Sequence, residues 1–280
     1  MNYSHAFHAG NFADVVKHVV LVRILLHLGK KPTPFRVIDT HAGAGLYDLA
    51  GDEASRTGEW REGVGRLGAI DAATEAGAVL APYRALIDAD VAALRYPGSP
   101  LLAQRLLRDT DRAIFCETQR PVREHLARAL GRDRRAKILE IDGWTALGAF
   151  VPPPERRGLV LVDPPFEATG EFSRMAGAFS SAFRKWRTGI YMLWYPVKSF
   201  ERRDAFWSAL AASGAPELLR IEFGIAPVDP AGGLTRTGLA VANPPFMLAN
   251  EMRIVLPGLA QALGRGGAAT WSAETFGSNA

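Results

Sequence analysis

The stretch FRVIDTHAGAG, residues 35–45, places a glycine-containing turn directly after a short apolar run. The run at 35–39 predicts a buried strand, and Gly43 and Gly45 can adopt the positive φ values of a tight turn and let the backbone approach a ligand. A dinucleotide-binding turn would continue as G-x-G-x-x-G, but position 48 is an aspartate. The stretch therefore predicts the first strand and turn of a doubly wound α/β sheet that binds a ligand other than NAD.

Further strands are predicted where short apolar runs lie between charged residues, glycine or proline. Four runs, at 113–117, 137–142, 158–163 and 189–195, predict buried parallel strands, because helical patterns separate them. Two later runs, 217–225 and 238–242, are joined by a loop rich in proline and glycine, which predicts an antiparallel pair. The predicted fold is α/β, with a Rossmann-like, mainly parallel sheet and an antiparallel last strand.

One connection between the predicted strands is too long for a single helix. Glu117 follows Asp39 by 78 residues, whereas Asp142 follows Glu117 by 25 and Asp163 follows Asp142 by 21. The surplus of roughly 50 residues begins with a polar loop and continues with a helical pattern. The loop is expected at 51–65 and the helical part at 70–98. We therefore predict three parts: residues 1–50 with an N-terminal lid, the first helix and the start of the core, a small helical insertion at 51–95, and the remainder of the core at 96–280.

The first helix is predicted at about residues 12–28, directly after the lid. Its sequence is apolar on nearly all sides, so it should be buried. Asn11 is the predicted N-cap, with Asp14 three residues later as in a capping box, and Gly29 ends the helix.

The composition is that of a globular protein with a full core, with 280 residues of which 48% are hydrophobic and 22% charged. The single cysteine, Cys116, argues against a disulfide framework. The longest apolar stretch, VVLVRILLHLG at 19–29, is interrupted by Arg23 and is shorter than the ~20 residues of a bilayer span. We therefore expect a cytoplasmic protein with no membrane segment and no obligate protein partner. A net charge of +4 is only a weak indication of a polyanionic partner.

Four of the predicted strands end in a carboxylate, at Asp39, Glu117, Asp142 and Asp163. Ligands of open α/β sheets bind outside the carboxyl ends of the strands, so these side chains should meet at one edge. Glu117 can accept hydrogen bonds from both hydroxyls of a ribose, and Asp142 with the backbone of Gly143 can pair with an adenine edge. Neither contact needs a phosphate, which predicts S-adenosylmethionine as the cofactor.

The motif DPPF at 163–166 is the candidate catalytic motif. Asp163 and the carbonyl of Pro164 are both hydrogen-bond acceptors, and Phe166 offers a face on which a flat substrate base can stack. Two acceptors aimed at an exocyclic amine would hold its nitrogen towards a sulfonium methyl group, which allows a direct in-line displacement. A second copy, NPPF at 243–246, follows the last strand pair, beyond the strands that end in carboxylates. We predict that this second copy is structural.

The N-terminal histidines raise the alternative of a metal site. His5 and His8 form an H-x-x-H pattern, but neither a metalloprotease glutamate nor a cysteine cluster accompanies it. We therefore expect no metal. Basic clusters at 132–137, 155–158 and 184–187 each precede a strand, which places them at the edge opposite the site. Phosphate contacts of a nucleic-acid substrate would then come from Lys17, Lys198 and scattered arginines.

Five segments together resemble the bacterial 23S ribosomal RNA adenine-N6-methyltransferase family of the RlmJ type, over essentially the whole chain. The segments are SHAFHAGNFADVVKH (4–18), DTHAGAG (39–45), YPGSP (96–100), VDPPFE (162–167) and WYPVK (194–198). The glycine turn and the DPPF motif are shared with many class I methyltransferases. The N-terminal stretch and YPGSP therefore carry most of the specificity for this family.

The resemblance implies a class I methyltransferase fold and methyl transfer from S-adenosylmethionine to the N6 amine of an adenine in 23S ribosomal RNA. It also implies that the N-terminal segment folds over the cofactor pocket, that Asp163 is the catalytic acceptor and that Tyr3 faces the substrate base. The cofactor contacts that it implies are His18, His41, Ser99, Glu117, Asp142 with Gly143, and Asp163.

Two other functions are compatible with the same motifs. A DNA adenine-N6 methyltransferase would use the same DPPF chemistry, but it usually needs a larger target-recognition domain and must flip the base out of a duplex. A non-catalytic RNA-binding module would keep only a vestigial cofactor fold. The intact Asp163 beside Gly43 and Gly45 argues against that module.

Overall fold

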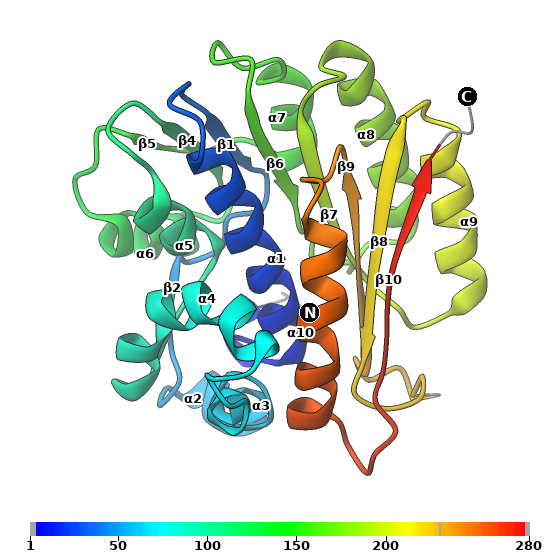
Figure 1. The fold of residues 1–280 in the computed structure, drawn as a ribbon. Helices are drawn as coiled ribbons and strands as arrows, with labels where there is room; N and C mark the ends of the chain where they lie inside the picture. Colours follow the sequence, from blue (N-terminus) through cyan, green and yellow to red (C-terminus); the bar gives the residue numbers. More distant parts are fainter. Residues whose placement is uncertain (1–3, 230, 278–280) are drawn as a thin grey trace.

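The computed structural model describes residues 4–229 and 231–277. In this part of the chain an eight-stranded sheet has the order β10-β8-β9-β7-β6-β1-β4-β5, and a separate hairpin pairs β2 with β3 (Figure 1). The strands of the large sheet are β1 (Arg36–Asp39), β4 (Arg112–Cys116), β5 (Ala136–Leu139), β6 (Gly158–Val162), β7 (Ile190–Pro196), β8 (Glu217–Gly224), β9 (Arg236–Ala242) and β10 (Thr270–Gly277). All the predicted strands are present, and the α/β fold class is confirmed.

The order of the sheet reverses at β1, which fixes where a ligand can bind. β1 pairs in parallel with β4 on one side and with β6 on the other. The chain therefore builds the sheet outward from β1 in one direction and then returns to build it in the other. At such a reversal the strand ends open a crevice at the carboxyl edge. Strand β9 runs antiparallel to β8, as the sequence predicts, and it also pairs antiparallel with β7.

Helices cover both faces of the sheet and form two large hydrophobic clusters with it, and a third, small cluster contains Ile114, Cys116 and Ala146. One face carries α1 (Phe12–Gly29), α4 (Glu75–Ala92), α5 (Ser99–Leu106), α6 (Arg120–Leu130) and α10 (Leu248–Leu263). The other face carries α7 (Gly143–Ala149), α8 (Glu171–Lys185) and α9 (Phe200–Ala211). Helix α1 also contacts α4, α5 and α10, so it is buried on nearly all sides, as its apolar sequence predicts (Figure 1).

Two parts of the secondary structure differ from the prediction. The segment 51–65 is not a loop but contains α2 (Asp52–Thr57), α3 (Glu59–Glu62) and the start of the 3-10 helix η2 (Val64–Ala69), while β2 (Leu46–Asp48) and β3 (Arg95–Pro97) pair at its base. The edge strand β10 was not predicted, because Ala273 is its only buried residue and its sequence lacks an apolar alternation. The division into three parts stays a prediction.

None of the helices formed by residues 4–229 and 231–277 combines the length and the apolar character needed to cross a bilayer.

Candidate active site

A cavity of about 1770 Å³ lies at the carboxyl edge of the parallel strands. Its walls come from residues that follow β1, β4, β6 and β7, from the N-terminal segment and from the loop before β9. The predicted site residues that line it are His18, His41, Gly43, Ser99, Glu117, Asp142, Gly143, Asp163, Pro164, Phe166 and Lys198. Gly45 does not line the cavity, and Tyr3 lies outside the described residues. The fold therefore brings nearly all of the predicted site residues together.

The turn after β1 requires glycine at positions 43 and 45, mainly because neighbouring protein atoms leave no room for a Cβ. Gly43 and Gly45 have φ values of +65° and +77°, which confirms the predicted positive φ. A Cβ at Gly43 would lie 2.4 Å from the Tyr47 hydroxyl oxygen, and a Cβ at Gly45 would lie 2.7 Å from Leu126 Cδ1. Gly45 lies against α6, and its predicted contact with the cofactor stays a prediction.

Asp39 lies beneath this turn and does not line the cavity. Its carboxylate is 2% exposed and accepts hydrogen bonds from the Ser99 hydroxyl (2.7 Å) and the His41 backbone N–H (3.2 Å). Burial raises the pKa of Asp39 to about 7, and the nearby Asp163 carboxylate adds to the rise, although the Ser99 hydrogen bond opposes it. Asp39 therefore holds the turn in place, and it keeps the Ser99 hydroxyl occupied.

The raised pKa of Asp39 predicts a specific dependence of stability on pH. Its folded-state pKa of about 7 lies above the ordinary value of 3.8, so the folded protein binds more protons between these values. Stability from this group is therefore lost as the pH rises from about 4 to about 7. Asp39→Asn should keep the shape of the side chain and lose this dependence. Melting temperatures of both proteins, measured from pH 5 to pH 8 without cofactor, check this. Parallel curves for the two proteins would contradict the assignment.

The two histidines of the predicted cofactor site are neutral. Burial lowers the pKa of His18 to about 3 and that of His41 to about 4. His18 Nδ1 lies 2.7 Å from the Tyr96 hydroxyl, which also bonds to Tyr83, and His41 Nδ1 lies 2.8 Å from Thr40 Oγ1. His18 Nε2 is buried with no hydrogen-bond partner within the described ranges. A buried polar atom with no partner at the wall of a cavity fits a bound polar ligand such as the cofactor.

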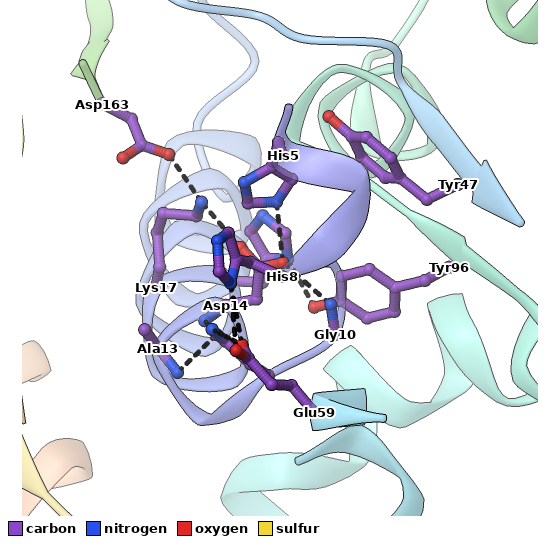
Figure 2. A network of polar contacts seen from close by, with 12 residues as sticks. His5, His8, Gly10, Ala13, Asp14, Lys17, Tyr47, Glu59, Tyr96 and Asp163 are labelled. Atoms are coloured by element: carbon purple, nitrogen blue, oxygen red, sulfur yellow. Dashed lines mark hydrogen bonds and ion pairs between the residues drawn. The ribbon is translucent and has the colours of Figure 1, made fainter. Parts of the chain in front are cut away.

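A buried ion-pair network joins α1 to the DPPF motif, and the sequence did not predict it (Figure 2). Lys17 Nζ lies 2.6 Å from Asp163 Oδ2 and 2.8 Å from Asp14 Oδ1, and the Lys17 side chain is only 6% exposed. Burial disfavours the charge, but Asp14 and Asp163 outweigh it, so the pKa of Lys17 lies well above its ordinary value. The prediction that Lys17 contacts phosphates is therefore wrong, because its ammonium group is enclosed between two carboxylates.

Asp14 anchors this network at the start of α1. Its Oδ2 accepts hydrogen bonds from the Gly10 backbone N–H (2.9 Å) and from His5 Nε2 (3.0 Å). Burial disfavours the carboxylate, but Lys17 and His5 outweigh it and hold the pKa of Asp14 well below its usual range. Asn11 Oδ1 caps the helix by accepting from the backbone N–H groups of residues 13 and 14, as predicted. The Asp14 side chain, however, bonds to Gly10 and not to Asn11, so the capping box is shifted by one residue.

The DPPF turn follows β6 directly and is held by aromatic contacts. Phe166 has a φ of +54°, an uncommon value for a residue with a side chain. Its ring centre lies 4.8 Å from that of Phe172 and 5.7 Å from that of Trp194. All four residues of the DPPF motif line the cavity, so the whole turn contributes to the wall of the same space.

The NPPF motif lies at the opposite edge of the sheet, because β9 runs antiparallel to its neighbours. The side-chain amide of Asn243 donates hydrogen bonds to the carbonyl oxygens of Arg187 (2.7 Å) and Gly189 (2.8 Å), in the segment before β7. None of the four residues at 243–246 lines the cavity, and Phe246 is 81% exposed. This location agrees with the prediction that this copy is structural, and the Asn243→Ala variant described below tests it.

Glu117 and Asp142 lie just after the second and third parallel strands, β4 and β5. Glu117 follows β4, and its Oε1 accepts from the Gln119 backbone N–H at 2.7 Å. Asp142 caps α7, with its Oδ2 3.0 Å from the Thr145 backbone nitrogen. A Cβ at Gly143 would lie 2.2 Å from the carbonyl oxygen of Thr40, so only glycine allows α7 to begin this close to the glycine turn. The contacts of Glu117 with the ribose and of Asp142 with the adenine stay predictions.

Glu117→Ala should mainly weaken the binding of S-adenosylmethionine. A carboxylate that accepts from ribose hydroxyls makes charge-assisted hydrogen bonds, each worth roughly 1.5 to 3 kcal/mol. The expected increase in the dissociation constant is about tenfold or more. Isothermal titration of wild type and variant with the cofactor measures it. An unchanged dissociation constant would mean that the strand β4 does not end at the ribose.

The N-terminal segment forms part of the cavity wall, as expected for a lid. His8 Nδ1 lies 3.0 Å from Glu59 Oε2 of the insertion, and this carboxylate raises the pKa of His8. The His5 ring packs edge-on against Tyr47, with ring centres 5.0 Å apart. Thus His5 and His8 are paired with carboxylates of different elements. A search of the described ranges finds no group of three or more ligand side chains that could hold a metal ion.

A family model described as Ribosomal RNA large subunit methyltransferase D, RlmJ, matches residues 32–274. The chain belongs to this family. Two relatives bear the name Ribosomal RNA large subunit methyltransferase J. That of Haemophilus influenzae is 36% identical over 98% of this chain and 98% of its own length, and that of Escherichia coli is 38% identical over 92% of each.

Solved structures share the fold of this chain. A protein from Legionella pneumophila is 31% identical, with a TM-score of 0.87 over 97% of this chain and 99% of that chain. A probable spermidine synthase from Corynebacterium glutamicum shares the fold alone, at 12% identity and a TM-score of 0.51 over 97% of this chain and 78% of that one. The family confirms the predicted enzyme class and its cofactor, S-adenosylmethionine, and favours an enzyme over a non-catalytic RNA-binding module.

Proposed function

We propose that this protein transfers the methyl group of S-adenosylmethionine to the N6 amine of one adenine in 23S ribosomal RNA. The observation that carries the proposal is the Asp163 carboxylate, which lines the cavity at the end of β6 and is held there by the buried Lys17. Acceptors at this place suit an amine substrate, because an amine brings N–H donors. A cytoplasmic location, where the ribosomal RNA would be met, is part of the same proposal.

The chemistry needs little more than the positioning of two groups. S-adenosylmethionine supplies an electrophilic methyl group on its sulfonium. Asp163 and the Pro164 carbonyl accept hydrogen bonds from the amine, which holds its nitrogen towards that methyl and makes the nitrogen more nucleophilic. The N–C bond forms as the C–S bond breaks, and the surplus proton of the amine passes to Asp163 or to water. Lys17 holds Asp163 in place and leaves its second oxygen for the substrate.

The remaining site residues are proposed to bind cofactor and base. Phe166 is proposed to stack on the target adenine, since its ring lines the cavity and is fixed by Phe172 and Trp194. Tyr3 is proposed to face the same base, although it lies outside the described residues. The proposed cofactor contacts are His18, His41, Gly43, Ser99, Glu117, Asp142 and Gly143.

Methylation of ribosomal RNA and methylation of DNA can be distinguished by their products. Ribosomal RNA from cells with and without the gene can be digested and its modified nucleosides mapped by mass. We expect one adenine of the large-subunit RNA to lose its N6-methyl group in the deletion strain and to regain it when the gene is restored. An unchanged RNA map together with a loss of N6-methyladenine from DNA would support the DNA enzyme instead.

A further inference from the structure

The mouth of the cavity is electrostatically uneven. Acidic side chains outnumber basic ones in its lining, and on the side of the insertion and β4 they include Asp48, Glu53 and Glu117. Lys198 and Arg202, at the start of α9, also line the cavity, are exposed and form no ion pair with any carboxylate of the described residues. A polyanion is therefore attracted at the α9 side of the mouth and repelled at the other side.

A third cation, Arg236, lies next to Lys198 in the fold, outside the residues that line the cavity. The Val197 backbone N–H donates to the Arg236 carbonyl at 3.0 Å, which places the start of β9 next to Lys198. Arg236 is half-buried, and its Nε has no hydrogen-bond partner inside the described part of the chain. Burial lowers the pKa of Arg236 from its ordinary value, and the nearby Glu222 opposes that change. Its guanidinium thus carries a charge that forms no ion pair with a carboxylate of residues 4–229 and 231–277.

An exposed aromatic ring completes the group. Phe200 is 46% exposed, and its ring centre lies 5.4 Å from the Arg236 guanidinium and 4.8 Å from that of Arg203. Arg203 is engaged by Glu222 and Asp204, so it fixes the ring without being available to a ligand. An unpaired cation beside a fixed, exposed ring suits a nucleotide, because the cation can meet the phosphate while the ring stacks on the base.

We propose that Lys198, Phe200, Arg202 and Arg236, the α9 strip, bind the RNA segment that flanks the target adenine. The proposal rests on the proposed function and adds to it the path of the RNA across the cavity mouth. Lys198, Arg202 and Arg236 contact phosphates of this segment, and Phe200 stacks on an unpaired base next to the target. Glu201 also lines the cavity, and its carboxylate repels a phosphate that comes close to the start of α9.

The test measures binding of protein-free 23S ribosomal RNA at several salt concentrations. In the variant Lys198→Gln/Arg202→Gln/Arg236→Gln, the slope of log affinity against log salt should become shallower by about 2, since each phosphate contact on single-stranded RNA contributes about 0.7. Phe200→Ala should bind about tenfold more weakly with the slope unchanged, because stacking involves no ion release. Methylation by the triple variant should show a raised KM for RNA.

A matched control removes the same charge from the opposite edge. Arg132, Arg134 and Lys137 lie before and at the start of β5, are exposed and have no ion-pair partner in the described segments. Their triple change to Gln should leave the slope as in wild type. The double variant Lys198→Gln/Arg202→Gln alters exposed residues only and should still make the slope shallower by about 1.4. A folding defect caused by the change at Arg236 therefore cannot decide the result.

The possible results distinguish a failure of the α9-strip proposal from a failure of the proposed function. Suppose that the wild-type protein methylates RNA. If the α9-strip variants then show the same salt slope as wild type, or if the control variant loses as much slope as they do, the α9 strip does not bind RNA, while the proposed function is unaffected. If wild type neither binds nor methylates any ribosomal RNA, the proposed function fails and the strip fails with it.

Discussion

Asp163→Ala is expected to lower methyl transfer by at least about a hundredfold, and to leave the protein folded. Removing the acceptor takes away the group that orients the amine, and positioned proton acceptors typically contribute factors of about 10² to 10⁴. The side chain is at the edge of the cavity, and Lys17 keeps its second partner, Asp14, at 2.8 Å. Single-turnover rates with saturating cofactor and RNA measure the loss, and a melting curve checks the fold.

Asn243→Ala is the matched control for this experiment, because it changes the first residue of the related NPPF motif. It removes two hydrogen bonds to the carbonyls of Arg187 and Gly189 and should lower stability modestly, by about 1 to 2 kcal/mol. Methyl transfer at a temperature where both variants are folded should stay close to wild type. Reversed phenotypes for the two variants would show that the catalytic motif has been assigned to the wrong end of the sheet.

Lys17→Met is the second change with a large expected effect. It leaves Asp14 and Asp163 without the cation that they share, and breaking a buried ion pair by removing one partner typically costs about 3 to 5 kcal/mol. We expect a clear fall in melting temperature and a loss of methyl transfer of about a hundredfold. Lys17→Arg keeps the charge and should recover part of both. Denaturant unfolding and single-turnover kinetics give the two quantities separately.

A double-mutant cycle distinguishes a positioning role for Lys17 from a general structural one. If Lys17 acts on catalysis through Asp163, Lys17→Met should cost little further activity once Asp163→Asn is present. The stability loss should persist in the double variant, because Asp14 still lacks its partner. Fully additive effects on the rate would mean that Lys17 influences turnover by a route that does not include Asp163.

The parts of the fold that the sequence predicted are those with strong local patterns. The central strands are buried on both faces and appear as continuous apolar runs in the sequence. The turn after β1 is indicated by Gly43 and Gly45. The DPPF and NPPF motifs could also be distinguished. DPPF follows a strand of the series that ends in carboxylates, whereas NPPF follows the last, antiparallel strand pair. Strand β10 lacked any such pattern, because Ala273 is the only buried residue among exposed and half-buried ones.

The role of Lys17 could not be predicted in the same way. Its partner Asp163 lies 146 residues away, and no local pattern connects them. One signal was present: Asp14 and Lys17 are three residues apart, on a helix that is apolar on nearly all sides, so a buried lysine there required a carboxylate. The position of Gly45 next to Leu126 and the hydrogen bond of Ser99 to Asp39 could not be predicted either, since both depend on packing between distant elements.

The most direct test of the account is methyl transfer by the purified protein from labelled S-adenosylmethionine to protein-free 23S ribosomal RNA. Small-subunit ribosomal RNA and single-stranded DNA serve as competing substrates, and the products are digested to nucleosides. We predict N6-methyladenosine at a single adenine of the 23S RNA, and a rate of labelling at least about a hundredfold lower with the Asp163→Ala protein. Label in DNA, label in another nucleoside, or labelling of RNA by the Asp163→Ala protein at a rate close to that of wild type would contradict the account.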